Sequence, residues 1–254
     1  MPESPGVVIL GGTAGVGLET ARQFAETGAR IVLLGRSVDR GAAAIEYLHS
    51  SVDGSDIRFV QVDATSPDDA VRAERDCREL LGAIDVLVNT TGPSEPPRLM
   101  HDIPITAVEP RIAEIMLPPI HLTHAVLPAM RERGSGAIIT VASDAAKLAT
   151  PGETLIGAAM AAIVMYSKAA ALEVKREGVR INLLTPSLIA GTPGAALIDG
   201  EPFSAKMFEK ASSMAHLGVA EASDLAAMVV YLASPLARRI TGQAISINGG
   251  ISVA

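Results

Sequence analysis

VVILGGTAGVG, at residues 7–17, sets the architecture that the rest of the chain follows. Four apolar residues suit a strand that is buried on both faces, and a glycine-rich turn and a helical pattern come next. Phosphates bind at such turns because glycines let backbone N–H groups approach a pyrophosphate, while the helix N-terminus supplies positive potential. A glycine-rich turn without a ligand is the alternative interpretation. The strand–turn–helix context favours a cofactor site, in which Gly17 also lets helix and strand pack closely.

Apolar strands and helical stretches alternate along the whole chain. Each predicted strand is apolar throughout, as expected when helices cover both faces of a sheet. Such alternation indicates βαβ units, so the predicted fold class is α/β. We expect one Rossmann-type domain over residues 1–254, a doubly wound parallel sheet with helices on both faces. The predicted strands are Val7–Leu10, Ile31–Leu34, Ile57–Val62, Val86–Val88, Ala137–Val141, Val179–Leu184 and Ala244–Ile247, seven in all.

Two stretches, Pro93–Pro104 and Pro186–His216, are the longest without a clear strand or helix pattern. Long loops in a compact domain tend to be lids or binding loops. Residues 186–216 are therefore predicted to form a substrate loop or lid within the domain.

Composition excludes several classes of function. The 254 residues carry a net charge of −7 and a pI near 5.3, which argues against binding to nucleic acid and to anionic membrane surfaces. Cys77 is the only cysteine, so neither a disulfide nor a cysteine-based metal site is expected. The first residues contain no secretion signal, and the longest uncharged apolar run, Leu155–Tyr166, is too short to span a bilayer. These features predict a cytoplasmic protein.

The end of the second predicted strand indicates which cofactor binds. NAD sites place an Asp or Glu there to hold the ribose hydroxyls. Here Gly35 occupies the position, and Arg36 and Ser37 follow. A guanidinium without a competing carboxylate suits a 2′-phosphate, so NADP is predicted, with NAD as the alternative. The plainer interpretation is that Arg36 only starts the next helix, in solvent.

Motifs along nearly the whole chain resemble those of the short-chain dehydrogenase/reductase family. Gly11, Gly15 and Gly17 match the family's TGxxxGxG motif, although Leu10 stands for its threonine. Further matches are Asp63 after the third strand, Asn89-Thr90-Thr91-Gly92 for NNAG, Val179-Arg180-Ile181-Asn182, Pro186-Ser187, Thr241-Gly242-Gln243 and Asn248-Gly249-Gly250. The resemblance implies an oxidoreductase whose nicotinamide cofactor is bound by Gly11, Thr13, Gly15, Val16, Gly17, Arg36, Ser37, Asp63, Ala64, Asn89, Gly92, Pro186, Ile189 and Thr192.

The catalytic groups of the resembled family are mostly missing. In that family Tyr protonates the carbonyl, Lys lowers the tyrosine pKa, Ser polarises the substrate and Asn supports a proton-relay water. Ser143 matches the serine, but the tyrosine position, thirteen residues further on, is Ile156, and the lysine position is Met160. Alignment back from Leu127-Pro128 places Ile115 at the asparagine position. Three of the four groups are thus replaced by apolar side chains.

No neighbouring pair restores the missing motif. Between Thr154 and Tyr166 no side chain can exchange a proton near neutral pH, and Tyr166 and Lys168 do not share a helix face. The candidate substitutes are Asp144 and Lys147, otherwise loop charges, and His121 and His124, otherwise helix-surface or subunit-contact residues.

Three functions fit this pattern. The first is an NADP(H)-dependent oxidoreductase that needs no tyrosine, because an iminium or another cationic substrate accepts hydride without a proton donor. The second is a catalytically silent NADP-binding sensor, or the partner of an active homologue in a hetero-oligomer. The third is non-redox chemistry on the same fold. The apolar stretch around Ile156 also fits burial against a second subunit, so a homo-oligomer, dimer or tetramer, is expected.

Overall fold

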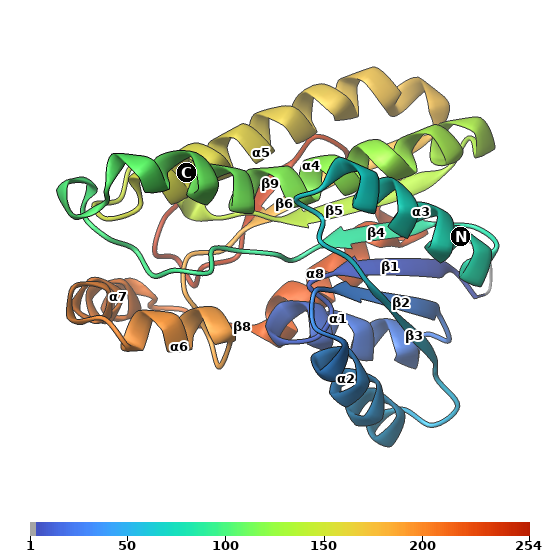
Figure 1. The fold of residues 1–254 in the computed structure, drawn as a ribbon, viewed down its shortest axis with the longest axis horizontal. Coiled ribbons are helices and arrows are strands. Elements are labelled where there is room, and N and C mark those ends of the chain that lie inside the picture. Colours follow the sequence, from blue (N-terminus) through green and yellow to red (C-terminus); the bar gives the residue numbers. More distant parts are fainter. Residues whose placement is uncertain (1–3) are drawn as a thin grey trace.

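The computed structural model describes residues 4–254, and a seven-stranded parallel sheet runs through its centre (Figure 1). The strand order is β3-β2-β1-β4-β5-β6-β9, so the chain winds outward in both directions from the β1–β4 pair. All seven predicted strands are present, which confirms the α/β, Rossmann-type fold class. The strands are β1 (Gly6–Leu10), β2 (Arg30–Gly35), β3 (Asp56–Gln61), β4 (Val86–Asn89), β5 (Gly136–Val141), β6 (Val179–Thr185) and β9 (Ala244–Ser246).

Helices cover both faces of the sheet because each strand buries alternate side chains on each face. In β1, Val7 and Ile9 pack with α1 and α8, whereas Val8 and Leu10 pack with α3 and α4. All four side chains are at most 3% exposed. Figure 1 shows α3, α4 and α5 together on one face, with α1 and α2 on the other. The helices are α1 (Gly15–Glu26), α2 (Val38–Ser51), α3 (Pro67–Leu81), α4 (Val108–Arg133), α5 (Thr154–Val174) and α8 (Ala222–Ala233).

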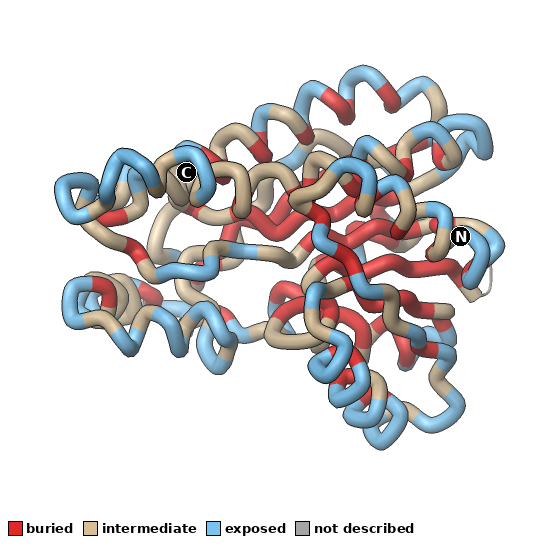
Figure 2. The backbone as a smooth tube through the Cα atoms, viewed as in Figure 1, coloured by how far each residue is buried: buried red, intermediate tan, exposed pale blue. Residues whose placement is uncertain are grey.

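Residues 186–216 are more regular than predicted. They contain β7 (Ile189–Ala190), α6 (Pro193–Asp199) and α7 (Pro202–Met214), and β7 pairs with β8 (Ala220–Glu221). The prediction of an irregular stretch was wrong because two helix starts were overlooked: Pro193 and Pro202 each begin a helix, where a missing N–H does no harm. Both helices lie to the left in Figure 1; in Figure 2, α6 is mostly exposed, whereas α7 is largely a mixture of exposed and intermediate residues.

Residues 93–104, the other stretch predicted to be irregular, contain one short 3-10 helix and lead to a second. This segment follows β4 and precedes α4, so it passes over the carboxyl end of the sheet. The 3-10 helices of the chain are η1 (Met100–Asp102), η2 (Ile105–Ala107), η3 (Asp144–Ala146), η4 (Lys175–Glu177) and η5 (Pro235–Ala237).

The helical stretch Thr154–Glu177, which joins α5 and η4, is long and apolar enough to cross a membrane, with a mean hydropathy of 1.7. It extends beyond Leu155–Tyr166, the uncharged apolar run that is too short to span a bilayer. One side of α5 is buried against α4 and β6, where Ile163, Ala171 and Val174 are at most 4% exposed. A core helix of a globular domain has this character too, and its packing here accounts for the apolar residues on that side.

A cleft at the carboxyl edge of the sheet

A cleft of about 440 Å³ lies at the carboxyl ends of the strands. Segments that follow β1, β2, β4, β5 and β6 form its walls, and α6 lies across it. In open α/β sheets ligands bind at this edge, where the strand order reverses. The predicted site residues that line the cleft are Gly11, Thr13, Gly15, Val16, Arg36, Gly92, Ser143, Ile156, Met160, Pro186, Ile189 and Thr192.

The glycine turn after β1 brings backbone close to the cleft. Gly11 and Gly15 have φ angles of 78° and 52°, a region that side chains rarely adopt. A Cβ on Gly17 would lie 2.3 Å from the Gly11 carbonyl oxygen, so only glycine lets α1 start this near to β1. This confirms the predicted packing role of Gly17. The first turn of α1 contains no acidic residue that would repel a phosphate.

Two arginines form what we call the basic end of the cleft. Arg36, directly after β2, and Arg40, in the first turns of α2, both line the cleft and are exposed at its rim. Ser37 does not line the cleft; its hydroxyl caps α2 by accepting from the Arg40 N–H at 3.3 Å. Gly35 ends β2 with no carboxylate, as the sequence predicted. The glycine turn and these cations therefore fit a dinucleotide with its phosphates.

Several other predicted cofactor residues do not line the cleft. Asn89 is 1% exposed and donates to the Thr140 hydroxyl at 3.1 Å, which ties β4 to β5. Asp63 accepts hydrogen bonds from the Thr65 N–H and hydroxyl, at 3.1 and 2.6 Å. The predicted residues outside the lining are Gly17, Ser37, Asp63, Ala64, Asn89 and Ile115.

The wall at the opposite end of the cleft is apolar around one serine. Ser143 lines the cleft with Ile156 and Met160, which lie one turn apart on α5. Ile115 and Met160 are each 3% exposed and belong to one apolar cluster, against which Ile156 packs. Ser143 Oγ accepts from the Ala145 N–H at 3.1 Å, which leaves its hydroxyl hydrogen free to donate.

The two candidate substitutes after Ser143 do not line the cleft, because they hold the C-terminal segment. Asp144 is 6% exposed and accepts from the Asn248 amide at 2.5 Å and the Ser252 hydroxyl at 2.6 Å. Lys147 Nζ donates to Ser246 Oγ and to the Ala254 oxygen, both at 2.6 Å. The interpretation of these residues as plain loop charges was therefore wrong. The histidines also lie elsewhere: Nδ1 of His121 is 3.0 Å from the Ala64 oxygen, and His124 is exposed.

Carboxylates that the sequence analysis did not single out line this end, which we call the acidic end. They are Glu95, Glu114 and Glu153, from the segment after β4, from α4 and from the residue before α5. Glu153 is one helical turn before Ile156, and this spacing of three was the available signal. Burial, with a smaller contribution from Asp144, raises the pKa of the Glu153 carboxyl, and the Thr150 hydroxyl opposes the shift.

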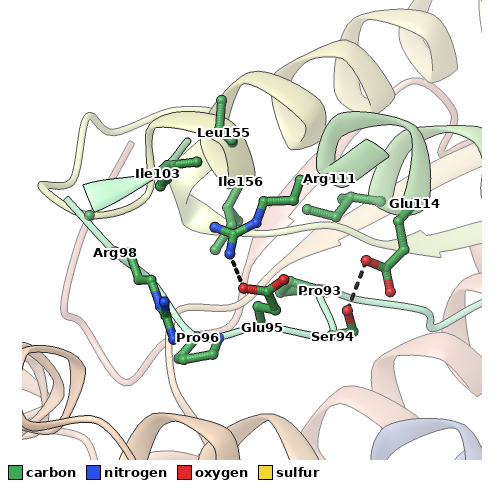
Figure 3. A pocket seen from close by; sticks show the side chains of 12 residues that line it. Pro93, Ser94, Glu95, Pro96, Arg98, Ile103, Arg111, Glu114, Leu155 and Ile156 are labelled. Atoms are coloured by element: carbon green, nitrogen blue, oxygen red, sulfur yellow. Dashed lines mark hydrogen bonds and ion pairs between the residues drawn. The ribbon is translucent and has the colours of Figure 1, made fainter. Parts of the chain in front are cut away.

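A small side hollow of about 20 Å³ adjoins the acidic end (Figure 3). Arg111 forms an ion pair with Glu95 there, and the Ser94 hydroxyl donates to Glu114 at 2.8 Å.

Two prolines interrupt the backbone hydrogen bonds of α4. Pro118 and Pro119 have no N–H, so the Glu114 and Ile115 carbonyls lack their usual helical donors.

The cations around the acidic end pair with other groups. Arg98 pairs with Glu201 at 3.0 Å, and Lys147 lies 3.7 Å from Asp144. Among residues 4–254, the ion pairs therefore leave Glu114 and Glu153 without a cationic partner. Over the same residues, no group of three His, Cys, Asp or Glu side chains is placed to hold a metal ion.

The two ends of the cleft lie at different strands along the same edge of the sheet. Arg36 follows β2, whereas Glu153 belongs to the segment after β5, and β1 and β4 lie between these strands. Three strand spacings amount to about 14 Å. One cleft thus offers positive charge at one end and negative charge at the other.

Known proteins resemble the chain over nearly its full length. Residues 11–252 match the family model described as enoyl-(acyl carrier protein) reductase. A 7alpha-hydroxysteroid dehydrogenase of Bacteroides fragilis is 30% identical, over 97% of this chain and 94% of its own. A 3-oxoacyl-(acyl-carrier-protein) reductase of Chlamydia pneumoniae is 29% identical, over 97% and 96%.

Solved structures share the same architecture. An actinorhodin polyketide ketoreductase, crystallised with NADPH, has a TM-score of 0.89 and 26% identity, covering 99% of this chain and 98% of its own. A short-chain type dehydrogenase/reductase from Mycobacterium ulcerans has a TM-score of 0.90 and 24% identity, covering 98% and 90%. With this fold, this cleft and these relatives, the chain belongs to the short-chain dehydrogenase/reductase family of oxidoreductases.

Proposed function

We propose that the protein is an NADP(H)-dependent oxidoreductase whose acceptor carries positive charge at the reacting carbon–nitrogen bond, as an iminium does. The observation that carries this proposal is the charge pattern of the cleft. Arg36 and Arg40 lie at one end, and the carboxylates of Glu114 and Glu153 lie at the other without a cationic partner in the described chain.

The basic end supports NADP over NAD. Arg36 is placed at the end of β2, beside the glycine turn, where a 2′-phosphate would be held. A charged hydrogen bond to phosphate is stronger than a neutral one, and no carboxylate at Gly35 competes for the arginine. The related ketoreductase was crystallised with NADPH, which is consistent with this assignment.

The acidic end supports a cationic acceptor. When bound, the nicotinamide supplies a hydride. A ketone that accepts hydride becomes an alkoxide, and here its oxygen would face Ile156 and Met160, which neither donate a proton nor solvate an anion. A cation becomes neutral on accepting hydride, so the apolar wall favours that change. Ser143 can orient the acceptor by turning its hydroxyl oxygen toward the cation, since an iminium nitrogen has no lone pair that could accept a hydrogen bond.

The test compares two substrates of similar shape. NADPH oxidation is followed with the N-methyl iminium salt of dihydroisoquinoline and with the bicyclic ketone tetralone, after subtraction of the rate without enzyme. We expect the iminium to react faster by about 10²-fold or more, the range that general acid catalysis normally contributes to carbonyl reduction. Faster reduction of the ketone would contradict the proposal. Tight NADPH binding with no turnover of either substrate would favour a silent cofactor-binding protein.

We also propose that the protein self-associates in the cytoplasm through the outer face of α5. Met165 and Leu172 on this helix are 67% and 66% exposed, although the opposite side of α5 is buried in the domain. Exposed apolar groups on one helix face are typical of a contact between subunits. Light scattering after gel filtration measures the oligomer, and Met165→Glu/Leu172→Glu is expected to yield a monomer.

A further inference from the structure

We propose that Glu153 is a catalytic residue that donates a proton to the nitrogen of a neutral imine in the cleft. This inference rests on the proposed function and extends its substrate class from fixed iminium cations to imines that are protonated on the enzyme.

The position of Glu153 supports this role. It immediately precedes α5 and lines the same cleft as Ser143 and Ile156. One helical turn separates Glu153 from Ile156, the position that the family uses for its proton donor. The Glu153 side chain makes no capping hydrogen bond to α5, so helix formation does not occupy the carboxyl group.

The cations near Glu153 bind other groups, so they do not form an ion pair with its carboxyl group. Lys147 on the segment after η3 is bound to Ser246 and Ala254, and the side chain of Asp144 in η3 adds negative charge. On α4 and the segment after β4, Arg111 and Glu95 pair with each other, and Glu114 adds a second carboxylate. The remaining cation of the side hollow, Arg98, pairs with Glu201 before α7.

These surroundings favour the protonated form of the Glu153 carboxyl. Burial raises its pKa, and Asp144 raises it further, while Thr150 opposes the shift. The N-terminus of α5 also favours the ionised form. Burial contributes more than Thr150 or Asp144 and the net shift is upward, so Glu153 holds its proton to a higher pH than an exposed glutamic acid does.

The proton and the electrons balance in a simple sequence. The Glu153 carboxyl loses its proton to the imine nitrogen, which creates an iminium beside a carboxylate. The hydride brings two electrons to the imine carbon, the C=N bond becomes a single bond, and the product is a neutral amine. Glu153 then takes up a proton from the solvent, so the net reaction consumes one imine, one hydride and one proton. Glu114, whose carboxylate accepts a hydrogen bond from the Ser94 hydroxyl at 2.8 Å, attracts the cation.

The experiment measures kcat/KM for a trimethylindolenine, a weakly basic cyclic imine that stays neutral at pH 6, and for its N-methyl iminium salt, with wild-type protein and with Glu153→Gln. At pH 6 we expect the substitution to lower the rate on the neutral imine by about 10²–10⁴-fold, the usual contribution of a general acid. The loss on the iminium is expected to be about tenfold or less. Glu132→Gln, which removes an exposed carboxylate at the far end of α4, is the matched control.

The pH dependence separates proton donation from a structural role. Protonation of the free imine in solution affects the rates of both proteins equally. The ratio of the wild-type rate to the Glu153→Gln rate therefore reports only the ionisation of Glu153. For the neutral imine this ratio is expected to fall as pH rises through the raised pKa of Glu153, and for the iminium it is expected to rise. Equal losses on both substrates, or no loss on either, would overturn the inference.

A binding measurement keeps the inference testable if neither substrate is turned over and the proposed function fails. Calorimetry of the iminium on NADP-loaded protein is expected to show tighter binding with rising pH in wild type and in Glu153→Asp, and no such trend in Glu153→Gln. If the affinity of the wild-type protein for the iminium did not change with pH, this result alone would overturn the assignment of Glu153. Melting temperatures of all variants confirm that they are folded.

Discussion

At the basic end of the cleft the chain keeps what the family needs to hold a dinucleotide. Gly11, Gly15 and Gly17 make the close backbone turn, and Arg36 lies at the end of β2. At the acidic end, Ile156 and Met160 occupy the positions at which the family's tyrosine and lysine were predicted, and carboxylates line the same cleft.

The difference shows that the two ends of one cleft are under separate physical constraints. Cofactor binding depends on backbone geometry that a single Cβ would destroy, since Gly17 has no room for one. The reaction end depends on side chains, which can be exchanged without moving the backbone. A change of acceptor class is therefore compatible with an intact cofactor site.

The largest expected effect comes from restoring the missing side chains at the acidic end. In Ile156→Tyr/Met160→Lys we expect reduction of a simple ketone such as tetralone to rise by about 10²–10⁴-fold, because a proton donor meets the developing alkoxide. The measurement is kcat/KM for the ketone with NADPH. Ile156→Phe/Met160→Leu is the apolar control and should give no gain. Rapid ketone reduction by the unaltered protein would break the comparison, because it would mean that Glu153 or another acid at this end also protonates a ketone oxygen.

A smaller effect is expected from the basic end. Arg36→Ala should weaken NADPH binding by about ten- to hundredfold, since a charged hydrogen bond contributes roughly 1.5–3 kcal/mol. NADH binding should change little, because it lacks the 2′-phosphate. Calorimetric dissociation constants for both cofactors measure the ratio. If the unaltered protein bound NADPH and NADH with equal affinity, the assignment of NADP as its cofactor would be wrong.

Removing a carboxylate at the acidic end is expected to have a weaker effect still. Glu114→Gln should raise KM for the N-methyl iminium by a few fold, because a partly exposed charge contributes at most about 1 kcal/mol. The NADPH dissociation constant should stay unchanged, since Glu114 lies on α4, which follows β4, and Arg36 follows β2, two strand spacings or about 10 Å away. If cofactor affinity fell together with substrate affinity, the two ends would not be independent.

The smallest expected effect is on stability. Because burial raises the folded-state pKa of Glu153, its stabilising contribution is complete below the unfolded pKa, near 4.3, and is lost as pH rises through the raised value. Glu153→Gln has no such loss, so its melting temperature should match the wild type at pH 4 and exceed it at pH 8. Thermal unfolding followed by circular dichroism at both pH values measures the difference. A constant difference across this range would mean that Glu153 is not buried enough to matter.

The sheet and the cofactor turn were predictable because their signals are local in the chain. Apolar runs such as Ile31–Leu34 mark strands buried on both faces, and the glycine turn after Val7–Leu10 needs no distant residue to be recognised. Local signals also existed for α6 and α7, in the prolines at their first positions, and were overlooked. The prediction that Ile156 and Met160 replace the family's tyrosine and lysine likewise rested on spacing along one helix.

The acidic end was decided by tertiary structure. Glu114 and Glu153 are distant in sequence, and only the packing of α4 against α5 brings them to one cleft. Asp144 and Lys147 gave no sign that they would hold Asn248 and Ala254, since those contacts span more than a hundred residues. Periodicity reports which face of an element is buried, but charge pairing depends on which elements meet. The sequence by itself therefore determined the fold and the glycine turn at the carboxyl edge of the sheet, whereas the charges that line the cleft were set by helix packing.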